Sequence, residues 1–239
     1  MKKYLIESLL IFVSVLSAFV LESIRLEQSK IKLKNDLLIE LKSVIKEDLI
    51  QIEKVTTVLN ESFKSSIILR DDFLSKRKLS NEVVAKEFAK LRFMNISYFP
   101  QNGVFNQLLN TGSLELIGKK ELKKKLMYTY EHLNKRKSGN DFILDEMTWR
   151  NFQKLSDQIY VVSQIQEHIE FNNKKKFIFT DSPIKTFFIS NRYYESNKVI
   201  QFYAQIGLLM KQYKDLIEEI VSEYNKIIIY IEDELKDGK

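Results

Sequence analysis

The stretch VIQFYAQIGLLMKQYKDLIEEIVSEYNKIIIYIEDEL, residues 199–235, carries the strongest periodic pattern in the sequence. Its apolar residues recur every three or four positions, a spacing that places them on one face of an α-helix. These residues are Val199, Phe202, Ile206, Leu209, Tyr213, Leu216, Ile220, Tyr224, Ile227, Ile231 and Leu235. A stripe of this length predicts one long C-terminal helix with a coiled-coil-like seam, which needs a partner of comparable length.

A second stripe near the N-terminus offers that partner. It follows Leu38, Leu41, Ile45, Leu49, Ile52, Val55, Leu59 and Phe63. Neither Gly nor Pro occurs before Pro100, so no residue there forces a helix to end. We expect a membrane-proximal long helix within residues 25–79 that ends near Arg77. A local break of this helix at 62–66 is an alternative. The long helix should pair antiparallel with the C-terminal helix, and pairing with a second copy of the chain is the alternative.

The composition favours the same fold class. Six Gly and two Pro among 239 residues leave few tight turns for building sheets. The absence of Cys excludes disulfide scaffolds, thiolate metal sites and thiol nucleophiles. With 44% hydrophobic and 29% charged residues, the chain is neither disordered nor a polytopic transporter. We therefore predict an all-α protein.

An apolar segment at the N-terminus has the length of a membrane span. No charged residue lies between Glu7 and Glu22. Counted from Tyr4 to Ile24, the segment has about 21 residues, or roughly 31 Å of helix, which matches the hydrocarbon core of a bilayer. We expect residues 1–24 to form a membrane anchor.

A cleaved signal peptide is the alternative for this segment. Lys2 and Lys3 form a suitable basic start, and Ala18 is small enough to precede a cleavage site. However, the large Leu16 fills the third position before that cut, and residues 19–21 remain apolar. These features favour a retained single-pass anchor.

The basic residues around the span give opposing signals for its orientation. Lys2 and Lys3 favour a cytoplasmic N-terminus, whereas Arg25, Lys30 and Lys32 directly after the span favour the reverse. The short N-terminal tail is typical of an uncleaved signal anchor. We expect a periplasmic or extracellular C-terminal portion, with the cytoplasmic orientation as the alternative.

Three residues of the span are candidates for contacts between helices in the membrane. Ser14 and Ala18 are four positions apart, and small residues at that spacing let two helices approach closely. Glu7 is an ionisable residue within the apolar segment and could hydrogen-bond across such an interface. These residues suggest a homo-oligomer.

The central region, residues 80–182, reads as short helices joined by loops. Ser80 or Asn81 can cap a helix, and Asn95–Gly103 is the clearest loop. Gly112 and Gly118 stand where left-handed helix ends are expected. The last long helix is expected within residues 183–239.

Two longer helices are predicted in the second half of the central region. One covers 119–137 and the other runs from Phe142 to about Gln166, with 138–140 as an optional interruption between them. The short FIFT tract, residues 177–180, resembles a strand but is too short to found a sheet.

The helix predicted at 119–137 is strongly basic. It holds eight Lys or Arg residues, among them Lys119, Lys120, Lys123, Lys124, Lys125 and Lys137, against Glu121 and Glu131. Leu122, Leu126, Tyr130 and Leu133 form its apolar stripe, so the lysines should occupy the opposite face. Such a face suits anionic lipid headgroups or an acidic partner, and a solvated surface without a partner is the alternative. Nucleic acid is a weaker candidate, because lysine without interleaved arginine or exposed aromatic residues reads bases poorly.

Three stretches together resemble a family of uncharacterised bacterial membrane proteins. They are IESLLIFVSVLSAFVLESIRLEQ (6–28), LKNDLLIELKSVIKEDLIQI (33–52) and VFNQLLNTGSLELIGKKELKKKLMYTY (104–130). The first is similar to an anchor that opens with Gly-Glu and closes with Leu-Ile-Ala-Leu-Gln-Ile-Asn-Asn-Trp, although Ile6 replaces the Gly and the Trp is absent. The resemblance implies a single-pass anchor in a bacterial inner membrane and a helical soluble part. It implies no activity.

No residue pattern points to catalysis, a metal, a cofactor or a small-molecule substrate. His132 and His168 lack metal-binding spacing, and the chain has no phosphate-binding glycine loop or nucleophile motif. We therefore expect a non-enzymatic scaffold or interaction subunit of a membrane complex, with lipid and other subunits as partners. The alternative is a membrane sensor or effector in stress or defence signalling that couples to ions through Glu7. A Glu7→Gln substitution distinguishes them, because it should disable only the ion-coupled protein.

Overall fold

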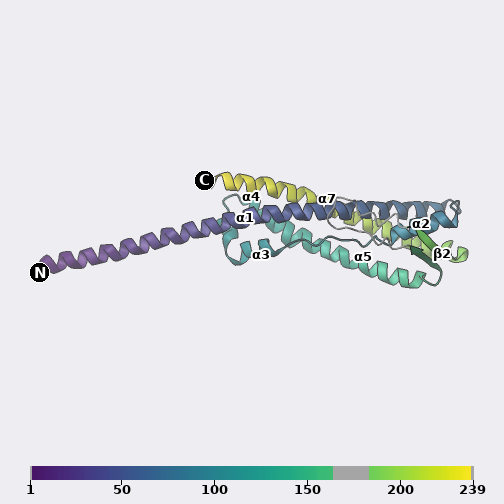
Figure 1. Ribbon diagram of the computed structural model, residues 1–239, viewed down its shortest axis with the longest axis horizontal. Coiled ribbons are helices and arrows are strands. Elements are labelled where there is room, and N and C mark those ends of the chain that lie inside the picture. Colours follow the sequence, from purple (N-terminus) through teal and green to yellow (C-terminus); the bar gives the residue numbers. More distant parts are fainter. Residues whose placement is uncertain (1, 164–182, 238–239) are drawn as a thin grey trace. The chain divides into compact units, whose positions relative to one another are not determined.

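Two long helices dominate the computed structural model, which describes residues 2–163 and 183–237, with side chains from Leu9 onward. They are α1 (Lys2–Leu74) and α7 (Asn197–Asp237). The two helices pack against each other and run antiparallel (Figure 1), since Lys34 meets Glu234 and Asp48 meets Tyr224. The predicted all-α class and the antiparallel pairing are confirmed.

The chain divides into two compact units. Unit 1 comprises Met1–Ile45, Gln101–Leu126 and Lys226–Lys239, and unit 2 comprises Lys46–Pro100 and Met127–Asn225. Unit 1 contains α3 (Gly103–Asn110), the 3₁₀ helix η1 (Ser113–Leu116) and most of α4 (Lys120–Met127). Unit 2 contains α2 (Asn81–Leu91), the π-helix η2 (Tyr128–Leu133), α5 (Asn134–Leu155), the strands β1 (Ile159–Ser163) and β2 (Ile184–Ile189), and α6 (Asn191–Tyr194). The expected central region 80–182 therefore contributes to both units.

The cores of both units are built on the two predicted apolar stripes. Leu38, Leu41 and Ile45 of α1 and Ile227 and Ile231 of α7 are buried in unit 1. The buried members in unit 2 are Ile52, Val55, Leu59, Val199, Phe202, Ile206, Tyr213, Leu216, Ile220 and Tyr224. Burying each such side chain contributes about 1.5–3 kcal/mol, so the stripes make a large contribution to the stability of both units.

Helix α1 continues through Ser62–Ser66, so the break considered there is wrong. The serines are buried and their hydroxyls are satisfied: Ser62 donates to the Lys90 carbonyl and Ser65 donates to Glu87. With these partners Ser62 and Ser65 do not compete with the helical backbone for hydrogen bonds, and Ser66 donates to the Phe63 carbonyl without breaking the helix.

The helix ends at Leu74, three residues before the predicted end, and buried Asp72 organises the turn that follows. One carboxylate oxygen accepts hydrogen bonds from the amides of Lys78 and Leu79, both at 2.8 Å. The other accepts from the hydroxyl of Tyr194 at 2.9 Å. Lys76 and Arg77 adopt positive φ angles of 61° and 57°, which reverses the chain without a glycine.

The start of the central region follows the prediction closely. Ser80 is the N-cap of α2, and its hydroxyl accepts a hydrogen bond from the amide of Val83. Residues 95–102 form the expected loop. Gly112 has a φ of 70°, as expected for a left-handed residue, but Gly118 does not. Gly118 instead donates its amide to Glu234.

The basic segment does not form a separate helix. α4, η2 and α5 follow one another without a gap from Lys120 to Leu155, so the interruption considered at 138–140 is wrong. The helix also ends earlier than the predicted Gln166. Ile159 and Val162 fit a helical spacing and were predicted to lie in this helix, but they lie in strand β1.

The small sheet was not predicted. β1 (Ile159–Ser163) pairs antiparallel with β2 (Ile184–Ile189), with Ile159 opposite Ile189 and a bulge after Val162. β2 and α6 occupy residues where the C-terminal helix was expected, and α7 begins only at Asn197. The FIFT tract lies outside the described residues.

Candidate functional site

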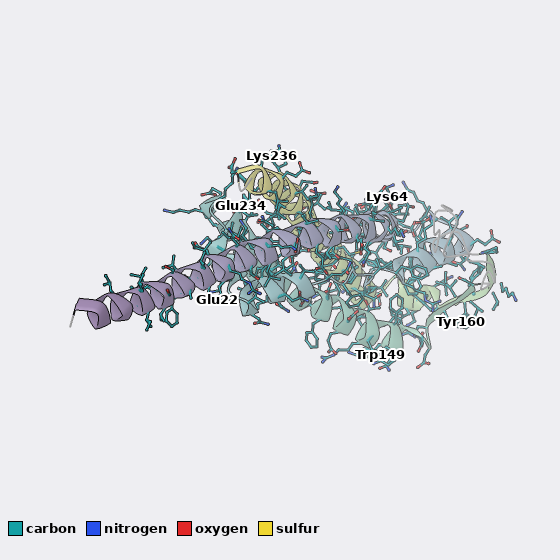
Figure 2. All side chains as sticks on the ribbon, turned by 60° about the vertical axis from the view of Figure 1, so that its left-hand side comes forward. Glu22, Lys64, Trp149, Tyr160, Glu234 and Lys236 are labelled. Atoms are coloured by element: carbon teal, nitrogen blue, oxygen red, sulfur yellow. The ribbon has the colours of Figure 1, made fainter. Side chains whose placement is uncertain are left out.

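An exposed apolar surface runs along α1 from Leu9 to Leu26. Phe19, for example, is 70% exposed and Leu21 is 68% exposed. The helix is long and apolar enough to cross a membrane by length and composition, and none of its most apolar window is buried inside the protein. Figure 2 shows these side chains projecting from a part of α1 that no other described element covers. Twelve of the large hydrophobic residues exposed in the described chain lie in this stretch.

The predicted contact residues within this surface have different environments. The hydroxyl of Ser14 donates to the Leu10 carbonyl at 2.8 Å, so its hydrogen-bonding capacity is used within α1. Ala18 is exposed. The side chain of Glu7 lies outside the described residues. If two copies of this helix pack through Ser14 and Ala18 as predicted, the small size of these side chains, and not a hydrogen bond from Ser14, is what allows the close approach.

The lysine surface of α4 is partly neutralised in unit 1. The ammonium of Lys119 lies 3.0 Å from Asp237 and 3.9 Å from Asp233, and Lys123 lies 3.4 Å from Glu115. Lys125 is half-buried. Lys120 and Lys124 are exposed, and no described carboxylate pairs with either of them. The uncompensated charge is smaller than the sequence suggests.

Glu234 forms a buried ionic cluster near Lys119 in the same unit. Its carboxylate accepts hydrogen bonds from the ammonium of Lys34 at 2.8 Å and from the amides of Gly118 and Lys119, both at 3.0 Å. The side chains of Lys34 and Glu234 are each only 6% exposed. The cluster joins α1, the two residues that precede α4, and α7 through one carboxylate.

Lys137 forms the corresponding cluster in unit 2. Its ammonium donates to Asp141 at 2.6 Å and to Ser97 at 2.8 Å, and it lies 4.6 Å from the ring centre of Tyr98. Tyr213 donates to the same Ser97 hydroxyl at 3.1 Å. Lys137 is buried. Its expected place on an exposed basic face is therefore wrong.

Buried tyrosines continue this polar interior. Tyr224 donates to the fully buried Asp48 at 3.1 Å, and its ring lies 6.2 Å from that of Tyr130, which the π-helix η2 carries. Burial raises the pKa of Tyr98 and Tyr130 far above the ordinary value of 10.0. At physiological pH these phenols therefore remain protonated.

These clusters do not form a recognisable catalytic arrangement. Among the described residues, no group of three or more His, Asp or Glu side chains could hold a metal ion. His132 is exposed and stacks on Tyr128, and His168 lies outside the described residues. Buried, mutually satisfied ionic groups of this kind typically specify how helices pair.

Comparisons with protein families, with curated proteins and with solved structures find no match to this chain. The resemblance to bacterial single-pass membrane proteins therefore rests on the three quoted stretches alone.

Proposed function

We propose that this protein is a membrane-anchored helical scaffold or interaction subunit of a membrane complex. The observation that carries the proposal is the exposed apolar surface of α1 between Leu9 and Leu26, which continues as one helix into both packed units. Transfer of its apolar side chains from water to lipid contributes on the order of 15 kcal/mol. Such a gain supports a single-pass anchor, and the resemblance to bacterial single-pass membrane proteins is the reason that we propose a bacterial inner membrane.

A second exposed surface in unit 2 supports an interaction role. Phe142 and Trp149 of α5 are seven positions apart, which places them on one face of the helix. Each is 67% exposed (Trp149 is labelled in Figure 2). Exposed aromatic pairs of this kind are typical of protein interfaces. A second copy of the chain or another subunit of the complex is the partner that we propose.

The anchor is tested by extracting membranes with alkaline carbonate. The unmodified chain should remain in the membrane pellet. One arginine in the span costs only about 2.5–3.5 kcal/mol, so the test combines Phe12→Arg, Leu16→Arg and Phe19→Arg, which should offset most of the gain and move a measurable fraction to the supernatant. The matched control combines Ile50→Arg, Ile68→Arg and Leu74→Arg, three exposed apolar residues of α1 outside the span. Complete extraction of the unmodified chain would disprove the anchor.

The interaction role is tested by the mass of the complex in mild detergent. We expect the full chain to elute as an assembly larger than its own 28.3 kDa. Phe142→Ser combined with Trp149→Ser should weaken that assembly by about tenfold or more, because aromatic anchors dominate interface energies. The matched control is Val83→Ser with Leu208→Ser, which alters exposed apolar residues elsewhere in unit 2. Equal masses for both variants, or a monomeric unmodified chain, would contradict the proposal.

A further inference from the structure

Unit 2 contains an open pocket of about 950 Å³ that plays no part in the proposed membrane role. Its walls come from the end of α5, the turn between α5 and β1, α6 with the residues that flank it, and the first turn of α7. Hydrogen bonds fix this wall, since the amide of Ser190 donates to the Gln158 carbonyl at 2.8 Å and the amide of Tyr194 donates to the Ser190 carbonyl at 2.9 Å. The pocket is therefore built on ordered backbone.

The charge of the pocket is predominantly positive. Lys154, Arg192 and Lys198 line it from three different helices, against one carboxylate, that of Asp157. Over residues 2–163 and 183–237, none of the three basic side chains has a hydrogen-bond or ion-pair partner. Other basic side chains of this unit do have such a partner, as Lys90 has Glu87 and Arg77 has Glu195. Three uncompensated cations around one concavity form an electrostatic site for an anion.

Hydrogen-bond donors accompany the positive charge. The hydroxyl oxygen of Ser196 is buried and has no partner among the described residues, although Ser196 directly precedes α7, where a serine usually caps the helix. Asn197 and Lys198 also line the pocket, and their amides have no backbone acceptor among the described residues, as expected in the first turn of a helix. A buried hydroxyl without a partner is costly unless a ligand satisfies it.

We propose that this pocket binds a phosphate group, either free or as a phosphate ester. A phosphate carries the double negative charge and the several acceptor oxygens that three cations and a hydroxyl donor require. Lys154, Arg192 and Lys198 neutralise the group, and the Ser196 hydroxyl donates to one of its oxygens. The carboxylate of Asp157 repels the anion and therefore limits the affinity of the pocket for phosphate. A phosphate at this position also lies at the positive end of α7, which favours it further.

The test is calorimetric titration of the full chain in detergent micelles with inorganic phosphate, at constant ionic strength maintained with chloride. We expect saturable binding, and about tenfold or greater weakening when Lys154→Gln, Arg192→Gln and Lys198→Gln are combined. The control combines Lys46→Gln, Lys86→Gln and Lys185→Gln, three exposed lysines of unit 2 outside the pocket. Both triple variants lose the same net charge, so only a site-specific effect separates them. Equal binding by the two, or no binding by the unmodified chain, would overturn the proposal.

Two single substitutions have opposite expected signs. Ser196→Ala should weaken phosphate binding severalfold, because it removes one donor, whereas Asp157→Asn should strengthen it severalfold. Weaker binding in Asp157→Asn would show that the pocket does not select anions, and would also overturn the proposal.

A second arm identifies the source of the phosphate. Micelles that contain phosphatidic acid are compared with micelles that contain phosphatidylcholine and a soluble sugar phosphate. Competition by the sugar phosphate indicates a soluble ligand, and competition by phosphatidic acid alone indicates a lipid headgroup; either result supports the site. Because these measurements use detergent-solubilised protein, failure of the pocket and failure of the membrane anchor are distinguished.

Discussion

Replacing Glu234 with glutamine is expected to lower the free energy of unfolding of unit 1 by about 3–5 kcal/mol. Removing one member of a buried ion pair leaves the other charge without compensation, and the cost falls in this range. Here the charge left without a counter-ion is the ammonium of Lys34, which is as buried as Glu234 itself. Glutamine also offers only one acceptor oxygen, whereas the amides of Gly118 and Lys119 bond to different carboxylate oxygens. Hydrogen exchange of residues 118–126 and 226–237 should therefore accelerate, with little change in unit 2.

The matched control is Glu232→Gln, two residues earlier on the same helix. Glu232 also pairs with a lysine of α1, Lys42 at 3.5 Å, but its side chain is 46% exposed. An exposed pair contributes about 0–1 kcal/mol, so the same chemical change should have little effect there. Equal effects at the two positions would contradict a special role for the buried cluster. The double variant Lys34→Met with Glu234→Leu should recover much of the loss, because it removes both charges.

The cluster also gives unit 1 a defined pH dependence. Burial alone would raise the pKa of Glu234, but the hydrogen bonds from Lys34, Gly118 and Lys119 outweigh it and hold the pKa below the ordinary value of 4.5. The folded state thus binds this proton less tightly than the unfolded state. The resulting stability is fully present above pH 4.5 and is lost as the pH falls through the lower pKa of the folded protein. Glu234→Gln should remove this part of the acid sensitivity in hydrogen-exchange measurements.

The long elements were predictable because each displays one uninterrupted apolar stripe. A stripe of eight or more apolar positions defines a helix face regardless of the residues around it. The break considered at 62–66 is absent from the structure because Ser62 and Ser65 donate to acceptors in α2. The sequence alone does not reveal these acceptors. The sheet was missed because Ile159 and Val162 also fit a helical spacing. A five-residue strand is too short to distinguish the two-residue period of a strand from the 3.6-residue period of a helix.

The sequence does contain a sign of the buried clusters, but a count of charged residues does not reveal it, because the sign is the position of each charge within an apolar stripe. Lys34 stands four residues before Leu38, so it occupies a stripe position of α1, and Glu234 stands three residues after Ile231 in the stripe of α7. Asp48 lies in register between Ile45 and Ile52. A charged residue at an apolar stripe position on each of two pairing helices predicts an internal partner. The phosphate pocket had no such signal, because its three cations come from segments that only the tertiary fold brings together.

Replacing Lys137 with methionine is expected to destabilise unit 2 by about 3 kcal/mol. The charge stands four residues after Leu133, within the apolar stripe of its helix, and only 2% of its side chain is exposed. Methionine preserves most of the volume but leaves Asp141 without its cation and removes one donor from the Ser97 hydroxyl. Loss of the ammonium also removes its attraction to the Tyr98 ring, about 0.5–2 kcal/mol. Chemical unfolding in detergent, with hydrogen exchange of residues 95–100 and 134–145 as a local readout, measures the effect.

Lys135→Met is the control that separates burial from charge in this prediction. Lys135 lies on the same helix and pairs with Glu131 four residues earlier, but its side chain is 71% exposed. A solvated pair of this kind contributes about 0.3–0.5 kcal/mol, so its loss should be barely measurable. If the two lysine variants were equally stable, Lys137 would belong to a solvated basic face after all. If Lys137→Met alone is destabilised, and Asp141→Leu in the same chain restores part of the loss, then the mutual dependence of the two buried charges holds α5 against the loop that carries Ser97 and Tyr98.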